Sequence, residues 1–382
     1  METPSDLGRP TWAEIDLDNL AFNVRELKNF LSDSVKLMAV VKANGYGHGA
    51  YEVSSVALKE GASMLGVASL EEGLKLRQSG IVSPILILGC TESRQNMLLL
   101  KWKLTPTLVN WEHSVSLSRC AGAVGKKVAV HIKIDTGMGR LGLFDPRDTL
   151  AFIERVYALP NIFVEGIYTH FAAADECEQS YTLKQLQCFM DIVNACRKKG
   201  INIPLKHAAN SAATIEFPRA HLDMVRVGIS LYGYYPSKEV RRDLVKLLPV
   251  MSLKSKVVFL KRVKAGTYIS YGRTYQAPHD TLIATVALGY GDGLCRSLSN
   301  RGFMLVRGVK VPIVGRICMD QTMLDVGRVP LVREGDEVIA LGNGALNADY
   351  IAELLDTISY EILCSVGNRV PRIYLSGQQN KP

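Results

Sequence analysis

The most constraining feature of this 382-residue chain is an alternation of short apolar runs with helical patterns through its first two-thirds. Eight runs have the length and composition of buried strands. They cover residues 36–41, 64–68, 85–88, 107–109, 128–134, 164–169, 203–207 and 224–227. Eight strands alternating with helices over about 230 residues predict a parallel (β/α)8 barrel, with an open doubly wound sheet as the alternative.

Two of the intervening segments carry a clear helical period. One has apolar residues three or four positions apart and Gly200 as its stop signal, the apolar positions being Leu183, Leu186, Phe189 and Val193. The other follows Asp18, which we expect to be its N-cap, and has the same spacing at Leu20, Val24, Leu27 and Leu31.

The pattern changes after Pro249. Strand-like runs at 254–263, 281–288, 303–314 and 337–341 are separated by glycine-rich turns, and one helix is indicated by Ile351, Leu354, Leu355 and Ile358. We therefore expect an α/β domain over 1–248, the TIM barrel, and a mostly-β domain over 249–382. No linker of Pro, Gly or Ser separates them, so we expect them to pack together.

Composition excludes several classes of protein. The chain is 47% hydrophobic and 21% charged, which is globular, and its net charge is +8. Lys and Arg are spread along the chain, and the densest cluster, at 241–264, is interleaved with apolar residues. That pattern favours a solvated face over a nucleic-acid site, with attraction to anionic lipid as a minor alternative.

The eight cysteines and the N-terminal residues indicate in which cellular compartment the protein is expected. No C-x-x-C pair occurs, so neither zinc spacing nor a disulfide framework is expected, and we predict no metal site. The first residues, METPSDLGRP, lack the apolar region of a signal peptide, and no run reaches the ~20 apolar residues of a spanning helix. We expect a cytoplasmic protein without nucleic-acid or membrane partners, although the chain is also compatible with being one domain of a longer protein.

Lys42 is the sharpest local feature. It closes the first apolar run and precedes Gly45, Gly47 and Gly49. Active sites of this barrel type lie at the carboxyl ends of the strands. A partly desolvated lysine there has a depressed pKa and suits Schiff-base chemistry, although an ordinary surface lysine has the same pattern.

Polar residues also follow the later strands. Arg140, in KIDTGMGRLG, has the geometry to bind a carboxylate or phenolate, and Arg226, flanked by valines, is expected to point into the barrel mouth. A buried arginine needs a partner, which an acidic residue could equally supply. Ser211 and the backbone N–H groups around Gly228 suit the phosphate site that barrels often form after strands seven and eight.

In their order along the chain, nine motifs resemble those of the alanine racemase family. They are VVKANGYGHG, KIDTGMGRLG, EGIYTHFAAAD, HAANSAA, RVGI-x-LYG, SYG-x-TY, GYGDG, GR-x-CMDQ and the terminal RVPR. The resemblance covers nearly the whole chain. It implies a barrel that binds pyridoxal 5'-phosphate, a C-terminal β domain, and racemisation of a small amino acid to supply D-amino acid for peptidoglycan precursors.

The same resemblance implies roles for individual residues. Lys42 and Tyr271 would be the two catalytic bases, with Lys42 also carrying the cofactor and Tyr271 reaching in from the partner subunit of a homodimer with shared active sites. Met319 would come from the partner too, and Lys133 matches a position that is often carbamylated. Further cofactor contacts are implied for Tyr46, Arg140, His170, Asn210, Ser211, Arg226, Gly228 and Ile229.

One position departs from many members of that family. They have a tyrosine before the terminal RVPR, where this chain has Asn368. An asparagine there resembles the serine/alanine racemases of vancomycin-resistance gene clusters, which are fused to a membrane-embedded half. Asn368 is smaller than tyrosine and offers hydrogen-bond donors and acceptors, so we expect it to contact substrate and to admit serine.

Three other functions compete with a racemase. A barrel-type pyridoxal-phosphate decarboxylase shares the cofactor lysine and a β domain, but the motifs around Tyr271 and Met319 argue against it. A cofactor carrier would not need the residues after Pro249. A basic nucleic-acid or membrane-surface binder is favoured by the charge alone.

Overall fold

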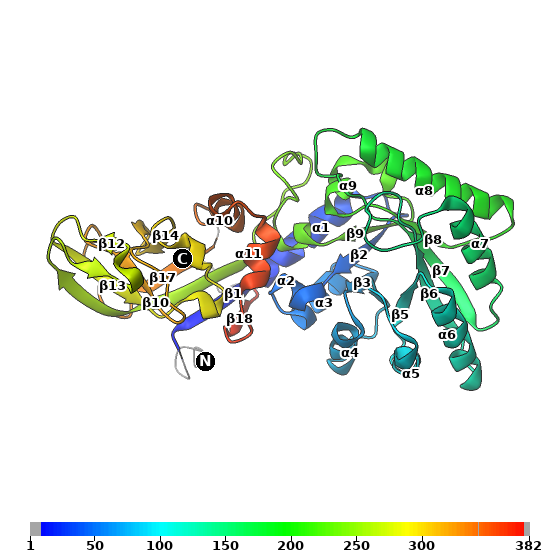
Figure 1. Ribbon diagram of the computed structural model, residues 1–382, viewed down its shortest axis with the longest axis horizontal. Coiled ribbons are helices and arrows are strands. Elements are labelled where there is room, and N and C mark those ends of the chain that lie inside the picture. The colour runs from blue at the N-terminus through cyan, green and yellow to red at the C-terminus, as the bar shows by residue number, and fades with distance from the viewer. Residues whose placement is uncertain (1–8, 343, 378–382) are drawn as a thin grey trace. The chain divides into compact units, whose positions relative to one another are not determined.

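The computed structural model describes residues 9–342 and 344–377 (Figure 1). The chain divides into two compact units. One, the barrel unit, comprises residues 20–45 and 50–248. The other, the β unit, comprises residues 46–49, the segment from 249 onward and the described residues before 20.

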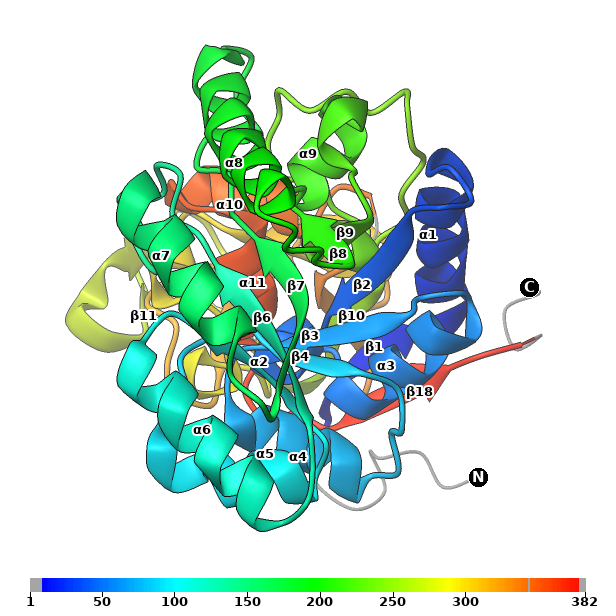
Figure 2. The same ribbon diagram turned by 90° about the vertical axis from the view of Figure 1, so that its right-hand side faces the viewer.

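Eight parallel strands form the barrel unit, and each of the eight runs predicted from the sequence is one of them (Figure 2). Neighbours follow chain order, and β9 pairs with β2. At the remaining edge the Asp223 N–H donates to the Lys206 carbonyl at 3.1 Å, which brings β9 to β8 and nearly closes the sheet. The predicted (β/α)8 barrel is confirmed. Its strands are β2 (Lys36–Val40), β3 (Met64–Val67), β4 (Ile85–Ile87), β5 (Thr105–Leu108), β6 (Val128–Lys133), β7 (Ile162–Tyr168), β8 (Leu205–His207) and β9 (Met224–Val227).

Helices surround these strands (Figure 2). Gly200 ends a helix as predicted, with φ of +75°. Of the apolar positions that indicated this helix, Leu183 is exposed, while Leu186 and Phe189 are buried. The helices are α1 (Leu17–Phe30), α3 (Ala50–Lys59), α4 (Leu70–Gln78), α5 (Asn96–Lys101), α6 (Trp111–Ala123), α7 (Pro146–Tyr157), α8 (Ser180–Lys198) and α9 (Ser211–Glu216).

The N-cap predicted for α1 was wrong. Asp18 lies inside the first turn, and the Asp16 carboxylate accepts the Asn19 N–H at 2.8 Å. The helix begins at Leu17, three residues before the first position of its apolar pattern, because β1 (Thr11–Asp16) leads directly into it.

Apolar side chains from six strands fill the barrel interior around Tyr168. Each is at most 8% exposed, and burial of such side chains stabilises the fold by roughly 1.5–3 kcal/mol apiece. The cluster comprises Met38, Met64, Leu86, Tyr168, Leu205 and Met224. The barrel is therefore a packed core, and chemistry is left to the strand ends.

The β unit is built on the long strand β10, which pairs with β1, β13 and β17. From the sequence we placed residues 1–248 together, but β1 belongs here, because it also pairs in parallel with β18. The further strands are β10 (Met251–Val263), β11 (Tyr268–Ile269), β12 (Tyr275–Gln276), β13 (Thr281–Val286), β14 (Phe303–Val306), β15 (Val309–Pro312), β16 (Thr322–Asp325), β17 (Glu337–Leu341) and β18 (Arg372–Leu375).

Two expectations for the β unit needed correction. The single strand predicted over 303–314 is the hairpin β14–β15, turned at Arg307 and Gly308, which both have positive φ. The predicted helix is α10 (Ala348–Leu355), and Ile358 lies outside it, exposed, before α11 (Ser359–Ser365).

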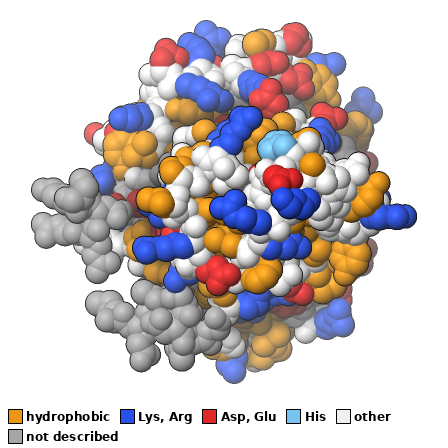
Figure 3. All heavy atoms as spheres, turned by 90° about the vertical axis from the view of Figure 1, so that its left-hand side faces the viewer, with side chains coloured by type: hydrophobic (Ala, Val, Ile, Leu, Met, Phe, Trp, Pro, Cys, Tyr) orange, Lys and Arg blue, Asp and Glu red, His pale blue; other side chains and the backbone are white. Residues whose placement is uncertain are grey.

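The basic segment 241–264 carries ion pairs. Arg241 pairs with Glu216, and Lys254 lies 2.9 Å from Glu14. Figure 3 shows Lys and Arg side chains dispersed among hydrophobic and uncharged ones on one face of the molecule. Within residues 9–342 and 344–377, no helix has the length and apolar character needed to cross a membrane.

Candidate active site

Lys42 lies half-buried at the carboxyl end of β2, as predicted. It begins the short helical segment α2 (Lys42–Tyr46), in which Ala43, Asn44 and Gly45 have φ of 51°, 54° and 62°. Left-handed backbone costs roughly 1–2 kcal/mol for each non-glycine residue. The turn that presents Lys42 must therefore be held by its surroundings.

Glu72 on α4 holds this turn. Its two carboxylate oxygens each accept a backbone N–H at 2.7 Å, one from Ala43 and one from Ala68. Sequence reasoning missed Glu72. The signal available was a helix start of the type Ser-x-x-Glu at Ser69, but the carboxylate reaches beyond that cap to the Lys42 turn.

The loop after β6 carries Arg140 and is organised by Asp135. The Asp135 carboxylate accepts backbone N–H groups from Gly137, Met138, Gly139 and Arg140 at 2.8–3.1 Å. Burial alone would raise the pKa of Asp135, but these four donors hold it below its ordinary value. The result is an anionic anchor beneath an exposed arginine.

Lys133 ends β6 and is 6% exposed. Its ammonium nitrogen lies 5.5 Å from the Tyr168 ring centre, and none of the hydrogen bonds among the described residues involves it. Burial, followed by the charges of Arg140 and Arg226, lowers the pKa of Lys133 to about 8. A substantial fraction of this amine is neutral, and so nucleophilic, in mildly basic solution.

Arg226 is 4% exposed and points into the barrel, as predicted. It donates to the Thr169 and Ala208 carbonyls at 2.8 and 3.1 Å, to His207 Nδ1 at 3.0 Å and to His170 Nδ1 at 3.1 Å. None of the ion pairs among the described residues includes it, so the acidic partner considered from the sequence is absent there. Burial lowers the pKa of Arg226 to about 10, which leaves a buried cation held only by neutral groups.

His170 lies where these cations converge. Burial lowers the pKa of His170 well below its usual value, and four cationic side chains act in the same direction: Arg226, Arg140, Lys133 and Lys42. The barrel mouth is thus strongly positive, and an anionic group would be stabilised there. A phosphorylated, phenolic cofactor with a substrate carboxylate fits this charge.

The residues expected to hold phosphate lie together at the ends of β8 and β9. Ser211 Oγ accepts the Gly228 N–H at 2.9 Å, so this N–H is occupied, while the hydroxyl hydrogen stays available to donate to an anion. Ile229 opens the 3-10 helix η4 (Ile229–Tyr232), whose first N–H groups have no acceptor within the helix. In the same turn the Ser230 hydroxyl is buried and has no partner among the described residues.

Asn210 and Tyr46, the two other predicted cofactor contacts, have structural surroundings of their own. Asn210 is the N-cap of α9, and its side-chain oxygen accepts the Ala213 N–H at 3.0 Å. Tyr46 belongs to the β unit, where its ring centre lies 6.0 Å from that of Tyr360. Burial raises the pKa of Tyr46, so its hydroxyl keeps its proton and can donate it.

Tyr271 and Met319 lie in the β unit with 70% and 53% of their surfaces exposed. The structure joins the two motifs that carry them, because Ser270 Oγ donates to the Arg316 carbonyl at 2.5 Å. Both side chains are accessible to solvent in a single chain.

Asn368 lies exposed in the turn after α11, and the turn is fixed on both sides. Gly367 donates to the Asp292 carbonyl at 3.0 Å, and Arg372 donates to the Gly367 and Val370 carbonyls, each at 2.6 Å. The position predicted to shape the substrate site is rigidly presented.

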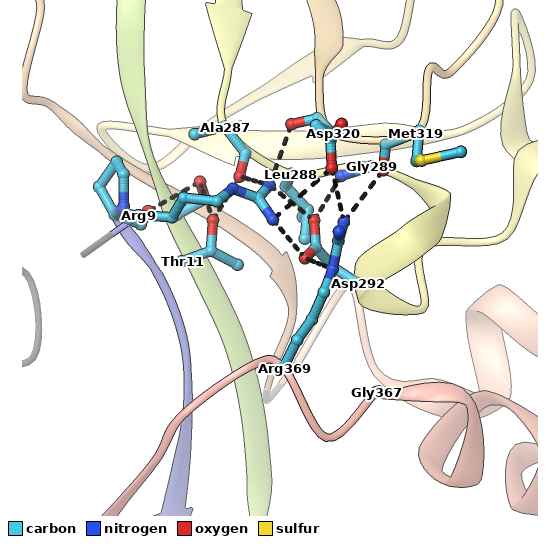
Figure 4. Close-up of polar contacts among 12 residues, drawn as sticks. Arg9, Thr11, Ala287, Leu288, Gly289, Asp292, Met319, Asp320, Gly367 and Arg369 are labelled. Atoms are coloured by element: carbon cyan, nitrogen blue, oxygen red, sulfur yellow. Dashed lines mark hydrogen bonds and ion pairs between the residues drawn. The ribbon is translucent and has the colours of Figure 1, made fainter.

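A cluster around Asp292 ties this turn to Met319 (Figure 4). The buried Asp292 carboxylate accepts two bonds from Arg9, at 2.8 and 2.9 Å, and one from Arg369 Nε at 2.8 Å. Arg369 also donates to the Met319 carbonyl at 3.2 Å and to the Asp320 carboxylate at 2.9 Å. GYGDG and RVPR were recognised as motifs from the sequence, but the contact between their charged residues, Asp292 and Arg369, was not predicted.

Family models match both parts of the chain. Residues 15–236 match the model described as alanine racemase, N-terminal domain, and residues 250–374 match the alanine racemase, C-terminal domain. Together the two models span most of the sequence.

Individual proteins give the same result. The chain is 48% identical to an alanine racemase of Desulfosudis oleivorans over 97% of each chain, and 48% identical to one of Halothermothrix orenii over 96% and 97%. Among solved structures, an alanine racemase of Clostridium difficile 630 superimposes with a TM-score of 0.93 at 43% identity, covering 97% of this chain and 96% of that one. One from Bacillus anthracis with bound L-Ala-P gives 0.92 at 39%, covering 98% and 97%.

Proposed function

Because this chain belongs to the alanine racemase family and is an amino-acid racemase, we propose that it interconverts L- and D-alanine with pyridoxal 5'-phosphate as its cofactor. The D-alanine would serve peptidoglycan precursors. The observation that carries the proposal is the convergence of four cationic side chains on His170, with Arg226 buried and unpaired by any carboxylate of the described residues. The decarboxylase alternative is disfavoured, because both matching family models are those of alanine racemase.

Most of the residues that would hold the cofactor lie at the barrel mouth. Lys42 would bind it covalently, Arg226 would face the ring nitrogen, and Arg140 would contact the phenolic oxygen and the substrate carboxylate. The phosphate would be held by Tyr46, Ser211 and Ile229, with the Gly228 N–H holding the Ser211 hydroxyl in place and Asn210 supporting that loop. Bound in this way, pyridoxal phosphate withdraws electrons from the substrate's Cα–H bond and makes that proton acidic.

Racemisation needs one proton removed from one face of Cα and another returned to the opposite face. Lys42 Nζ would take the proton of the D isomer and return one to form it. The Tyr271 hydroxyl oxygen would do the same for the L isomer. A neutral tyrosine hydroxyl is a poor base, so His170 and Arg226, which are hydrogen-bonded to each other at 3.1 Å, would support it.

Two residues would come from a second copy of the chain. The exposure of Tyr271 and Met319 supports a homodimer in which each β unit completes the partner's site. Lys133 would be carbamylated, since its lowered pKa leaves part of the amine neutral and able to react with carbon dioxide, and the added negative charge would orient Arg140.

Chiral chromatography of the products tests the proposal. Purified protein with pyridoxal phosphate and L-alanine should yield D-alanine until both isomers are equal. Lys42→Ala should abolish this, while Lys59→Ala, an exposed lysine on α3, should leave it unchanged. Absence of D-alanine from the intact protein would refute the assignment.

A second substrate is favoured by Asn368. The asparagine replaces a bulkier tyrosine of many family members and stands in a turn that Arg372 holds. We propose that it also admits L-serine, as in the vancomycin-resistance racemases, and the same chromatography with L-serine detects this directly.

A further inference from the structure

A continuous hydrogen-bonded chain runs through the barrel interior to the proposed site. Glu165 Oε2 lies 3.3 Å from His131 Nε2, and His131 Nδ1 lies 2.9 Å from His207 Nε2. His207 Nδ1 is 3.0 Å from Arg226 Nη1, and Arg226 Nη2 is 3.1 Å from His170 Nδ1. Arg226 and His170 were identified from the sequence as candidate site residues. The proposed function assigns no role to Glu165 or His131.

Arg226 at one end and Glu165 at the other together set the direction of the bonds between them. A guanidinium has only donors, so His207 Nδ1 must accept and must carry no hydrogen. The proton of neutral His207 then sits on Nε2 and is donated to His131 Nδ1. By the same reasoning His131 holds its proton on Nε2 and donates it to Glu165, whose carboxylate only accepts. The part of the chain from Arg226 to Glu165 thus has a permanent donor at one end and an anionic acceptor at the other.

The backbone is adapted to make the Glu165–His131 contact. Between β6 and β7, Val130 pairs with Val164 and His131 with Gly166, which leaves Glu165 as the extra residue of a β-bulge. Bulges re-aim side chains near functional sites. A Cβ at position 166 would lie 2.4 Å from His131 Nδ1, so only glycine lets the ring take its place.

Burial excludes an additional proton from the chain. His131 and His207 are both 0% exposed, and the Tyr168 ring stacks on His207 with centres 4.7 Å apart. The charged and titratable groups that act on the two rings are Glu165, Arg226 and Tyr168. Burial lowers the pKa of both histidines, in keeping with two neutral rings.

We propose that Glu165 and His131 are positioning residues that hold His207 in its Nε2–H tautomer and so orient the Arg226 guanidinium. They touch neither substrate nor cofactor. The inference rests on the proposed function only in making Arg226 the group that faces the cofactor ring. A hydrogen bond to an oriented site residue is the usual way in which outer residues tune such a group.

The tautomers are measured by NMR of the holoenzyme labelled with 15N-histidine. In the wild-type protein His131 and His207 should both give the Nε2–H pattern and should not titrate between pH 8 and about 6. Glu165→Leu should convert one or both to a mixed or titrating pattern, and Glu165→Gln, whose amide oxygen still accepts, should retain it. Glu154→Leu is the matched control, since Glu154 pairs instead with Lys199 on the surface.

The kinetic readout uses the same variants. Glu165→Leu should lower kcat/KM about tenfold and raise transamination relative to racemisation by a similar factor, with Glu165→Gln near wild type. The Nδ1–H tautomer at His207 in the wild type, or unchanged tautomers in Glu165→Leu, would overturn the inference. The His207 tautomer measured in the wild-type protein tests the inference even if Glu165→Leu does not fold. The spectra do not depend on turnover, so a protein that fails to racemise alanine refutes the proposed function and leaves the tautomer assignment intact.

Discussion

Lys133 is a buried amine whose charge is poised near physiological pH. With a pKa lowered to about 8 by burial and two arginines, about a tenth of it is neutral at pH 7 and about half at pH 8. Only the neutral amine reacts with carbon dioxide. In 13C-labelled bicarbonate, we therefore expect a carbamate carbon signal that grows from pH 7 to 9.

Lys133→Arg should abolish this signal, because an arginine keeps the charge but cannot be carbamylated under these conditions. Lys59→Arg, at an exposed position, should retain it. A signal that persists in Lys133→Arg would place the modification at another lysine.

Asn368 is the residue that we expect to set the serine preference. A tyrosine in the same turn would fill the space and leave the serine hydroxyl unpaired, which costs roughly 1–3 kcal/mol. Asn368→Tyr should therefore lower the serine-to-alanine ratio of kcat/KM about tenfold. If position 368 affects only phosphate binding, both substrates lose alike and the ratio, measured at saturating cofactor, does not change.

At the level of elements, the left-handed turn after β2 makes a prediction about Glu72. Removing its carboxylate replaces two hydrogen bonds to a charged group with hydrogen bonds to water, so Glu72→Ala should lower the free energy of unfolding by about 1–3 kcal/mol. Cofactor retention should also weaken, since the turn presents Lys42. Urea denaturation and equilibrium dialysis measure the two effects.

The neighbouring Glu71 provides the control. It is exposed, and Glu71→Ala should change the free energy of unfolding by less than about 0.5 kcal/mol. If both variants lost the same free energy of unfolding, the loss would come from the reduced negative charge of α4 and not from the turn that presents Lys42.

The elements also show what the sequence could and could not predict. All eight barrel strands were predictable, because each is an apolar run bounded by turn residues. The hairpin at Arg307–Gly308 was not, because its turn interrupts an otherwise continuous apolar run by only two residues. The bulge at Glu165 leaves no mark at all, since it changes which residues face each other and not which residues are apolar.

The same distinction holds for the site. Lys42, Arg140 and Arg226 could be singled out because charge at the end of an apolar strand is conspicuous. Glu72 and Asp135 could not, because an acidic residue in a loop or helix start has many ordinary uses. Their roles depend on which backbone N–H groups lie within reach, and that is a property of the folded chain.

For the whole molecule, three of the histidines whose pKa is lowered by burial predict sensitivity to acid. Burial lowers the pKa of His131, His170 and His207, so below pH 6.5 the unfolded chain binds protons that the folded chain does not. Stability should then fall as pH falls, by up to about 1.4 kcal/mol per pH unit for each histidine. Urea denaturation at pH 7.5, 6.5 and 5.5 measures it.

The exposed His279 gives the comparison for that experiment. His279→Gln should preserve the pH dependence. A free energy of unfolding that stays constant between pH 6.5 and 5.5 in the wild type would contradict the assignment of neutral buried histidines.

Shared sites predict complementation between inactive variants. In a mixture of Lys42→Ala and Tyr271→Ala proteins with free subunit exchange, half of the dimers are mixed, and each has one intact site. About a quarter of wild-type activity should return on this count. Continued inactivity despite exchange, shown by mass spectrometry of the dimers, would mean that each chain completes its own site.

The placement of β1 has a consequence for how the protein is made. Thr11 Oγ1 lies 3.0 Å from Ser255 Oγ, a partner 244 residues later in the chain. At roughly 5–20 residues per second, the ribosome needs about 12 to 50 s to deliver that partner. Through this interval β1 has emerged without β10 or β18, its row of N–H and C=O groups open to other strands. β1, the first strand of the described residues, is thus among the last of them to be paired, and during synthesis its open edge needs protection from other strands.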